Sequence, residues 1–384
     1  MRTILLTIFW STALLPFMCY FGYPGILYLL GKIFPFNPVK KSIFPSVSLI
    51  IPAYNEEKNI AKKVENTLSL EYPSEKVEIL VGSDGSTDQT AEIMGNLMSE
   101  RVRFFDFKEN RGKTAVQNDL VSHSHGDILI FTDAASFLHP KAIKKIVRNF
   151  ADPRIGCVAG RMRFVNTDKT LTTQSQGLYW RYETKIRSME SKLGRLIGVD
   201  GPLYAVKRDF YIPLEHYIMS DFLTPLLVLK QAKKVIWEPE AIVDEDPTTR
   251  AHHEFATRRR IALRGFVALW TNRDLLNPFK YPGLASQISL HKLFRWLIGP
   301  AVLLNLAATV LLSTSVFFKF LLFIYTLFIS AALAGYLLDH AKKKCRLLTL
   351  PYYFVLVNAA ASMGFFDFLK KKQATKWVPV REPE

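Results

Sequence analysis

Apolar residues are concentrated toward the two ends of this sequence, and the middle has the composition of a soluble domain. The first apolar segment runs from Thr3 to Leu30 and contains no charged side chain. It exceeds the roughly 20 residues that an α-helix needs to cross a bilayer. It also exceeds the apolar region of about 7 to 15 residues in a signal peptide, and no small-residue cleavage site follows it. We therefore predict a membrane-spanning helix here.

Three more apolar segments lie toward the other end, at residues 293–312, 317–338 and 352–369. The first two are long enough to span a membrane, whereas the third is marginal because it contains Asp367. Lys32, Lys40 and Lys41 follow the first helix and place the chain after it in the cytoplasm. Three full crossings would then put the basic residues 370–372 outside. We therefore expect the last segment to be re-entrant or to lie at the membrane interface.

Between these segments, short β-rich runs alternate with amphipathic stretches of helical length. The predicted strands are Ser46–Ile51, Val77–Gly82, Val102–Phe107, Ile128–Thr132 and Ile155–Ala159, and the predicted helices are 56–70, 88–98, 113–122 and 140–149. This alternation predicts an α/β fold with a mostly parallel sheet and helices on both faces. In the less regular stretch that follows, a helix over 176–193 fits either core packing or a membrane surface.

The patterns divide the chain into four predicted parts. These are an N-terminal membrane helix (1–34), a regular α/β half (45–160), a less regular half (161–277) and a C-terminal membrane region with two to three hydrophobic segments and a basic tail (278–384). The net charge of +16 arises from Lys and Arg beside the apolar segments, which favours a bilayer over nucleic acid as the partner. Cys19, Cys157 and Cys345 predict neither a disulfide framework nor a zinc site.

Candidate chemistry lies where the predicted strands end, because ligands of open α/β sheets bind at that edge. Asp133 follows the apolar run 128–131 and could hold a divalent cation or cap the next helix. Asp84 could bind a nucleobase or a ribose, or belong to a turn. Lys113, at a helix start, could meet a phosphate. A P-loop is excluded because Phe107 stands where it needs glycine, and no G-x-G-x-x-G follows the first strand.

The order of these motifs resembles the nucleotide-sugar half of the family 2 inverting glycosyltransferases, which have a GT-A-type fold. The resemblance rests on Ile50–Glu57, Asp84–Asp88, Gly112–Lys113, Thr132–Asp133, Gly198–Ala205, Ser220–Phe222 and Trp237–Ala241. The placement of the membrane segments is similar to that in cellulose, hyaluronan and poly-N-acetylglucosamine synthases.

The resemblance implies that residues 45–160 form a nucleotide-sugar-binding half and residues 161–277 an acceptor-binding half, and it implies roles for matching positions. Pro52, Ala53, Tyr54, Asn55, Glu56, Asp84, Gly112, Lys113 and Asp133 would bind the nucleotide sugar, and Asp200, Arg258, Arg259 and Arg260 the acceptor or the diphosphate. Asp133 would hold Mg²⁺ or Mn²⁺ on the diphosphate. Asp221 matches the general base that removes a proton from the acceptor hydroxyl. Attack opposite the leaving group would invert the anomeric centre and give a β-linkage.

The sequence departs from the family pattern in three places. Asp133-Ala134-Ala135 stands in place of Asp-x-Asp, and the acidic pair at the base is Ser220-Asp221. The Gln-x-x-Arg-Trp signature is absent, and residues 257–261 stand in its place. The arginines of this segment could clamp the diphosphate or hold anionic lipid headgroups. The tail segment Trp377–Arg381 resembles the gating segment of the synthases.

We therefore predict a multi-pass protein of the cell membrane with a cytoplasmic catalytic domain, partnered by membrane lipids and not by nucleic acid. It would transfer a sugar from a UDP-sugar to a growing polysaccharide or glycan. One alternative is transfer of a single sugar to a polyprenyl-phosphate or lipid-linked acceptor. Another is a catalytically silent membrane scaffold for a partner synthase, which the reduced metal motif suggests.

Overall fold

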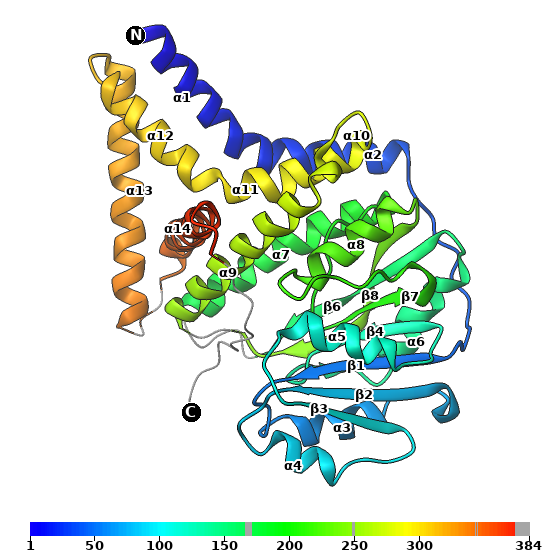
Figure 1. The fold of residues 1–384 in the computed structure, drawn as a ribbon. Helices are drawn as coiled ribbons and strands as arrows, with labels where there is room; N and C mark the ends of the chain where they lie inside the picture. Colours follow the sequence, from blue (N-terminus) through cyan, green and yellow to red (C-terminus); the bar gives the residue numbers. More distant parts are fainter. Residues whose placement is uncertain (166–170, 248–249, 342, 344, 373–384) are drawn as a thin grey trace.

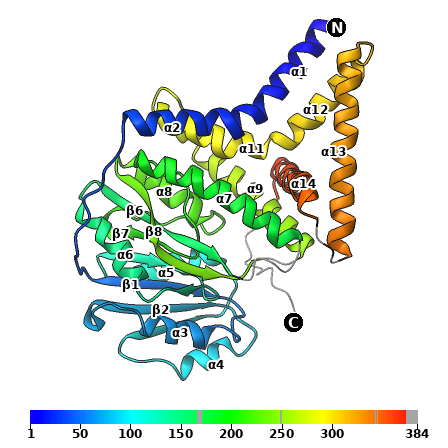
Figure 2. The ribbon, with the colours of Figure 1, turned by 180° about the vertical axis from the view of Figure 1, so that it is seen from behind.

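The computed structural model describes residues 1–165, 171–247, 250–341, 343 and 345–372, so the tail segment Trp377–Arg381 lies outside the described residues. A β-sheet lies at one end of the molecule, and the apolar helices of the two chain ends lie at the other (Figures 1 and 2). Between them lie α7 (Leu171–Lys192), α8 (Ser220–Lys230) and α9 (Ala251–Thr271).

The described part of the chain forms an eight-stranded sheet with the order β3-β2-β1-β4-β7-β6-β8-β5. Its strands are β1 (Val47–Ala53), β2 (Val77–Asp84), β3 (Val102–Phe107), β4 (Ile128–Phe131), β5 (Phe137–Leu138), β6 (Ile155–Phe164), β7 (Tyr204–Lys207) and β8 (Lys234–Glu245). Strands β3, β2, β1 and β4 run parallel, as do β6 and β8, whereas β7 and β5 pair antiparallel with their neighbours. The predicted mostly parallel sheet is confirmed, and it continues across residue 160.

Helices cover both faces of the sheet because successive strand residues point to opposite sides. In β1, Leu49 and Ile51 pack on one face and Ile50 on the other. The first face is covered by α3 (Ile60–Leu68), α4 (Thr90–Gly95) and α6 (Ala142–Val147), and the second by α5 (Lys113–Ser122) and α8. Two apolar cores therefore hold the sheet from both sides.

Several elements differ from their predicted extents. Helix α3 begins at Ile60 rather than at Glu56, since Asn55 has a positive φ of 53° and starts a loop. Strand β6 continues to Phe164, and α7 begins at Leu171. Strands β7 and β8 and helices α8 and α9 were not predicted, because this part of the sequence lacks a regular β-α alternation, and β5 was missed because it has only two residues.

The apolar segment near the N-terminus forms α1 (Arg2–Phe17) and α2 (Tyr23–Ile33), joined by a π-helical turn, and is one candidate span of 32 residues. Helix α13 (Val316–His340) and α14 (Thr349–Leu369) are also long and apolar enough to cross a membrane. Helices α10 (Pro282–Ile288) and α11 (Phe294–Trp296) precede a bend of 62° into α12 (Ile298–Leu311). Among the described residues there are thus three candidate spans, or up to four if the bent pair is one.

The segment 293–312 was predicted as one membrane span, and in the structure it is bent where α11 meets α12. The bend falls at Leu297, three residues before Pro300. Proline has no N–H to donate, and its ring clashes with the carbonyl group four residues earlier, which here belongs to Trp296. The bend turns α11 away from α12 and toward the sheet domain (Figure 1).

Helix α14 is more enclosed by protein than the other candidate spans. Half of its most apolar stretch is buried, compared with 11% for the N-terminal span and for α13. In Figures 1 and 2 it is seen end-on beside the upright α13, so it runs across that helix. The carboxylate of Asp367, which made this segment marginal in sequence, forms an ion pair with Arg259 of α9. The topology of this segment in a membrane stays a prediction.

We expect Gly85→Ala to destabilise the protein, because Gly85 has a φ of +69° and its missing Cβ would lie 2.8 Å from the backbone nitrogen of Asn110. A left-handed conformation alone costs a non-glycine residue about 1–2 kcal/mol. Thermal unfolding in detergent measures the loss. Gly95→Ala is the matched control, since a Cβ at Gly95 meets nothing within 4 Å. Equal melting temperatures for the two variants would contradict the expectation.

Candidate active site

The loops after β1 and β2 form one continuous surface at the carboxyl edge of the sheet. The Asn55 side-chain oxygen accepts a hydrogen bond from the backbone N–H of Thr87 at 2.8 Å. The backbone N–H of Asn55 donates to the Ser86 hydroxyl at 3.1 Å. In the same region, the Glu56 carboxylate accepts a bond from the Asn59 side chain at 3.0 Å and is buried. The predicted nucleotide-binding loops are therefore fixed to each other.

Asp84 is fully buried and organises the loop that precedes α5. Its carboxylate accepts hydrogen bonds from the backbone N–H groups of Arg111 at 2.9 Å and Gly112 at 2.8 Å. Burial raises the pKa of Asp84, although these two bonds act in the opposite direction. Gly112 has a φ of 96° and precedes the first residue of α5, which is Lys113. In this structure, Asp84 thus positions the loop from which Lys113 projects.

Three predicted site residues converge on Gly201. A Cβ at Gly201 would lie 3.1 Å from Lys113 Nζ, 3.4 Å from Asp221 Oδ2 and 3.7 Å from Asp133 Oδ2. Lys113 and Asp133 form an ion pair beside Gly201. The three side chains come from the start of α5, the loop after β4 and the first turn of α8, so the fold assembles them from distant parts of the sequence.

The Asp221 carboxylate is accessible for chemistry. Among the residues that the structure describes, none donates a hydrogen bond to it, and its side chain is partly exposed. Its neighbour Asp200 differs, because Arg187 of α7 forms an ion pair with it at 2.5 Å. Burial raises the pKa of Asp200, and Arg187 opposes that rise. Asp200 is therefore held in an ion pair, whereas no described residue forms an ion pair with Asp221.

The three consecutive arginines of α9 have different surroundings. Arg258 contacts the Glu254 carboxylate at 2.8 Å and the Tyr353 hydroxyl at 3.0 Å, whereas Arg259 pairs with α14. Burial lowers the pKa of Arg260, and the carboxylates of Asp221 and Asp133 partly offset this effect. Arg260 thus lies within electrostatic reach of both acids.

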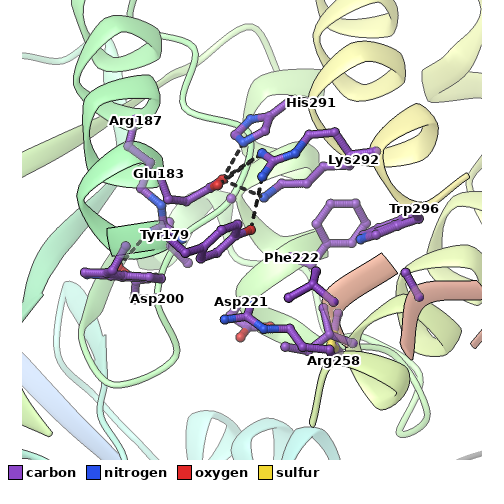
Figure 3. A pocket seen from close by; sticks show the side chains of 18 of the residues that line it. Tyr179, Glu183, Arg187, Asp200, Asp221, Phe222, Arg258, His291, Lys292 and Trp296 are labelled. Carbon is purple, nitrogen blue, oxygen red and sulfur yellow. Dashed lines mark hydrogen bonds and ion pairs between the residues drawn. The ribbon is translucent and has the colours of Figure 1, made fainter. Parts of the chain in front are cut away.

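A cavity of about 210 Å³ opens beside Asp221, between α7, α9, α11 and α14. Figure 3 shows His291 and Lys292 on one side of it, and Asp221 with Arg258 on the other. Glu183 of α7 accepts hydrogen bonds from His291 and Arg295 there. The cavity joins the candidate catalytic residues to the apolar helices.

Sequence analysis missed Lys63, which anchors the loop that carries Asp133. Lys63 is fully buried, and its ammonium group donates to the Thr132 hydroxyl at 2.8 Å and to the carbonyl group of Ser136. Burial lowers its pKa to about 7. A signal was present, since Ile60, Lys63, Val64 and Thr67 have the spacing of one helix face, and that face is buried.

Glu245, at the end of β8, is a second residue that was not predicted. Burial raises its pKa to about 8, and the neighbouring Asp133 carboxylate adds to the rise. Its Oε2 atom is buried without a hydrogen-bond partner among the described residues. Carboxylate oxygens suit Mg²⁺ or Mn²⁺, so Asp133 and Glu245 fit such a cation. The described residues contain no group of three or more potential metal-binding side chains, so phosphate oxygens of a ligand would have to complete the coordination.

The chain is similar to known glycosyltransferases in sequence and in fold. A family model described as "Glycosyl transferase family 2" matches residues 48–211. A probable glycosyltransferase of Bacillus subtilis, YdaM, is 33% identical over 137 residues, which cover 34% of this chain and 32% of that protein. An N-acetylglucosaminyltransferase of Rhizobium meliloti is 27% identical over 225 residues, which cover 54% of this chain and 52% of that protein. A poly-β-1,6-N-acetyl-D-glucosamine synthase of Staphylococcus aureus is 32% identical over 127 residues, which cover 33% of this chain and 30% of that protein.

The chain thus spans between about a third and a half of the length of these curated relatives. Among solved structures, a mannosyltransferase from Pyrobaculum calidifontis in complex with GDP-Man and Mn²⁺ matches with a TM-score of 0.72. The match covers 96% of this chain and 100% of that one, at 22% identity, and it shows the same fold. The predicted family and the GT-A-type fold are confirmed: residues 48–211 form a family 2 glycosyltransferase domain.

Proposed function

We propose that this protein is a membrane-bound, inverting glycosyltransferase that transfers a sugar from a UDP-sugar to a hydroxyl group of a glycan acceptor. The observation that carries the proposal is the convergence of Lys113, Asp133 and Asp221 around Gly201. This convergence brings a phosphate-binding cation, a metal-binding carboxylate and an available base to one point. The family 2 domain supports a nucleotide sugar as the donor.

In the proposed reaction, the acceptor oxygen attacks the anomeric carbon from the side opposite the diphosphate. The bond between that carbon and the diphosphate oxygen breaks, and the diphosphate leaves with the electron pair. Asp221 takes the proton of the acceptor hydroxyl, which makes the oxygen a better nucleophile. No described residue donates a hydrogen bond to its carboxylate, so both oxygens are available. The product has the inverted, β configuration if the donor linkage is α.

The charge that develops on the diphosphate would be offset by Lys113 and Arg260, which lie beside Asp133. A divalent cation held by Asp133, with Glu245 beside it, would neutralise part of that charge when bound. The same placement favours the diphosphate over lipid headgroups as the partner of Arg260. Arg259, in contrast, serves the contact between α9 and α14.

We place the protein in the cell membrane as a multi-pass protein with its catalytic domain in the cytoplasm. The three candidate spans support a membrane location, and the lysines after the first one support the orientation. The acceptor would enter through the cavity between α7, α9 and α11, since this cavity leads to Asp221. A growing polysaccharide or glycan is the acceptor that the family resemblance predicts.

We expect Asp221→Asn to lower turnover at least about 100-fold while donor binding is unchanged, because an amide cannot accept the proton. Purified protein, a panel of radiolabelled UDP-sugars and native lipid extract give the rate, and calorimetry gives donor affinity. Glu215→Gln, an exposed carboxylate in the preceding loop, is the matched control. Near-normal turnover of the Asp221 variant would remove this residue from its role as base.

We expect Asp133→Ala to abolish the part of donor binding that depends on Mn²⁺ or Mg²⁺, since the cation would lose its principal protein ligand. Calorimetric titration of a UDP-sugar with and without the metal measures this part. Asp209→Ala, a carboxylate on the surface, should bind the donor like the wild type. Unchanged metal-dependent binding would remove Asp133 from its role as a metal ligand. If the wild type bound no UDP-sugar at all, the silent scaffold would be the better interpretation.

A further inference from the structure

Most charges around the cavity beside Asp221 have a close partner of opposite sign. Its arginines form the ion pairs Arg187–Asp200 at 2.5 Å, Arg258–Glu254 at 2.8 Å and Arg295–Glu183 at 3.0 Å. Lys292 is different, because its nearest carboxylate among the described residues is Glu183, at 3.8 Å. That distance exceeds hydrogen-bonding range, and Glu183 already accepts bonds from His291 and Arg295. Lys292 is therefore the least closely paired cation among the described residues that line the cavity.

The ammonium group of Lys292 lies over the turn that leads to the catalytic point. It is 3.7 Å from the place where a Cβ of Gly198 would be, three residues before Gly201. Its side chain is 19% exposed, and Figure 3 shows it on the side of the cavity opposite Asp221. A largely enclosed cation whose nearest described carboxylate lies beyond hydrogen-bonding distance gains from a second anion at closer range. This end of the cavity is therefore suited to an anionic group.

A second cavity adjoins the first on the membrane side. It has a volume of about 820 Å³, and α1, α12, α13 and α14 line it, almost entirely with apolar groups. Asn358 of α14 lines both cavities, so they lie on the two sides of one residue. We call this second cavity the apolar groove. It offers an environment for a hydrocarbon chain beside the cavity that Lys292 lines.

We propose that the acceptor of this enzyme is lipid-linked. Its phosphate would bind Lys292, its hydrocarbon chain would lie in the apolar groove, and a hydroxyl beyond the phosphate would reach Asp221. Charge complementarity at Lys292 and the adjoining apolar groove together specify an amphiphile with an anionic linkage. A neutral, water-soluble polymer would use neither feature. The inference rests on the proposed glycosyl transfer and specifies its acceptor.

The reaction remains balanced with such an acceptor. The hydroxyl oxygen forms the new bond to the anomeric carbon, its proton goes to Asp221, and the nucleoside diphosphate leaves with the electrons of the broken bond. The lipid phosphate takes no part in bond changes. Lys292 is therefore a positioning residue in this proposal, and its loss should act on acceptor binding more than on the chemical step.

The test uses three synthetic acceptors with the detergent-purified full chain. One is a monosaccharide joined through a phosphodiester to a long alkyl chain, the second is the neutral glycoside of the same chain, and the third is the phosphodiester with a short chain. We expect Lys292→Met to raise the KM for the long phosphodiester about 10- to 100-fold, the value of a charge-assisted hydrogen bond. Its KM for the neutral glycoside and for the donor should not change, and Lys292→Arg should restore part of the loss.

The apolar groove is tested with a separate variant, so the proposal can be refuted even if the Lys292 variants do not fold. Ala359→Trp would fill the apolar groove, which Ala359 lines, and should raise the KM for the long chain but not for the short one. Lys280→Met, at an exposed lysine outside both cavities, should behave like the wild type.

Each remaining outcome decides between the two proposals. Extension of a soluble glycan with no transfer to the phosphodiester lipid would overturn the lipid-linked acceptor and leave glycosyl transfer intact. Binding of the lipid without glycosylation would make it a structural lipid and also overturn the inference. Equal KM changes for the charged and the neutral acceptor would exclude a phosphate at Lys292. Absence of both donor binding and transfer would instead refute the proposed function.

Discussion

Two carboxylates on one face of α7 hold the apolar helices against the sheet domain. Glu190 accepts hydrogen bonds from the Tyr23 hydroxyl of α2 and from His291, at 2.8 Å for the latter. Glu183 accepts from the other nitrogen of His291 and from Arg295 of α11. Burial alone would raise the pKa of Glu183, but Arg295 and His291 hold it well below its usual range. A buried network of this kind is stable only when every member has its partner, so it fixes the relative positions of three segments.

The same helix connects this network to the site. Arg187 lies one turn after Glu183 and forms the ion pair with Asp200, the residue before Gly201. Residues 183, 187 and 190 have the spacing of a single helix face. The placement of the turn at Gly201 therefore depends on the charges that attach the apolar helices to α7. On the other side of the cavity, α9 does the same through Arg259 and Asp367.

Much of the sheet could be predicted from sequence, because β1, β2 and β4 are buried on both faces and appear as nearly continuous apolar runs. The loops after them carried recognisable motifs, so Lys113, Asp133 and Asp221 could be named before their convergence was known. The arginines of α9 could not be assigned in this way. Consecutive residues on a helix point about 100° apart, so their partners depend on which helices pack around them. Lys63 and Glu245 were missed because sequence alone does not indicate which charged side chains become buried.

The apolar groove lies among helices whose outer surfaces are rich in exposed hydrophobic side chains, including Leu303 and Ile324 at its edge. Any molecule that occupies it arrives from within a lipid layer rather than from water. Its effective concentration is then the number of molecules per unit area of membrane. Added detergent or lipid lowers this surface concentration even when the total amount of the molecule in the sample is constant. Saturation of this site is therefore set by the composition of the bilayer around the protein.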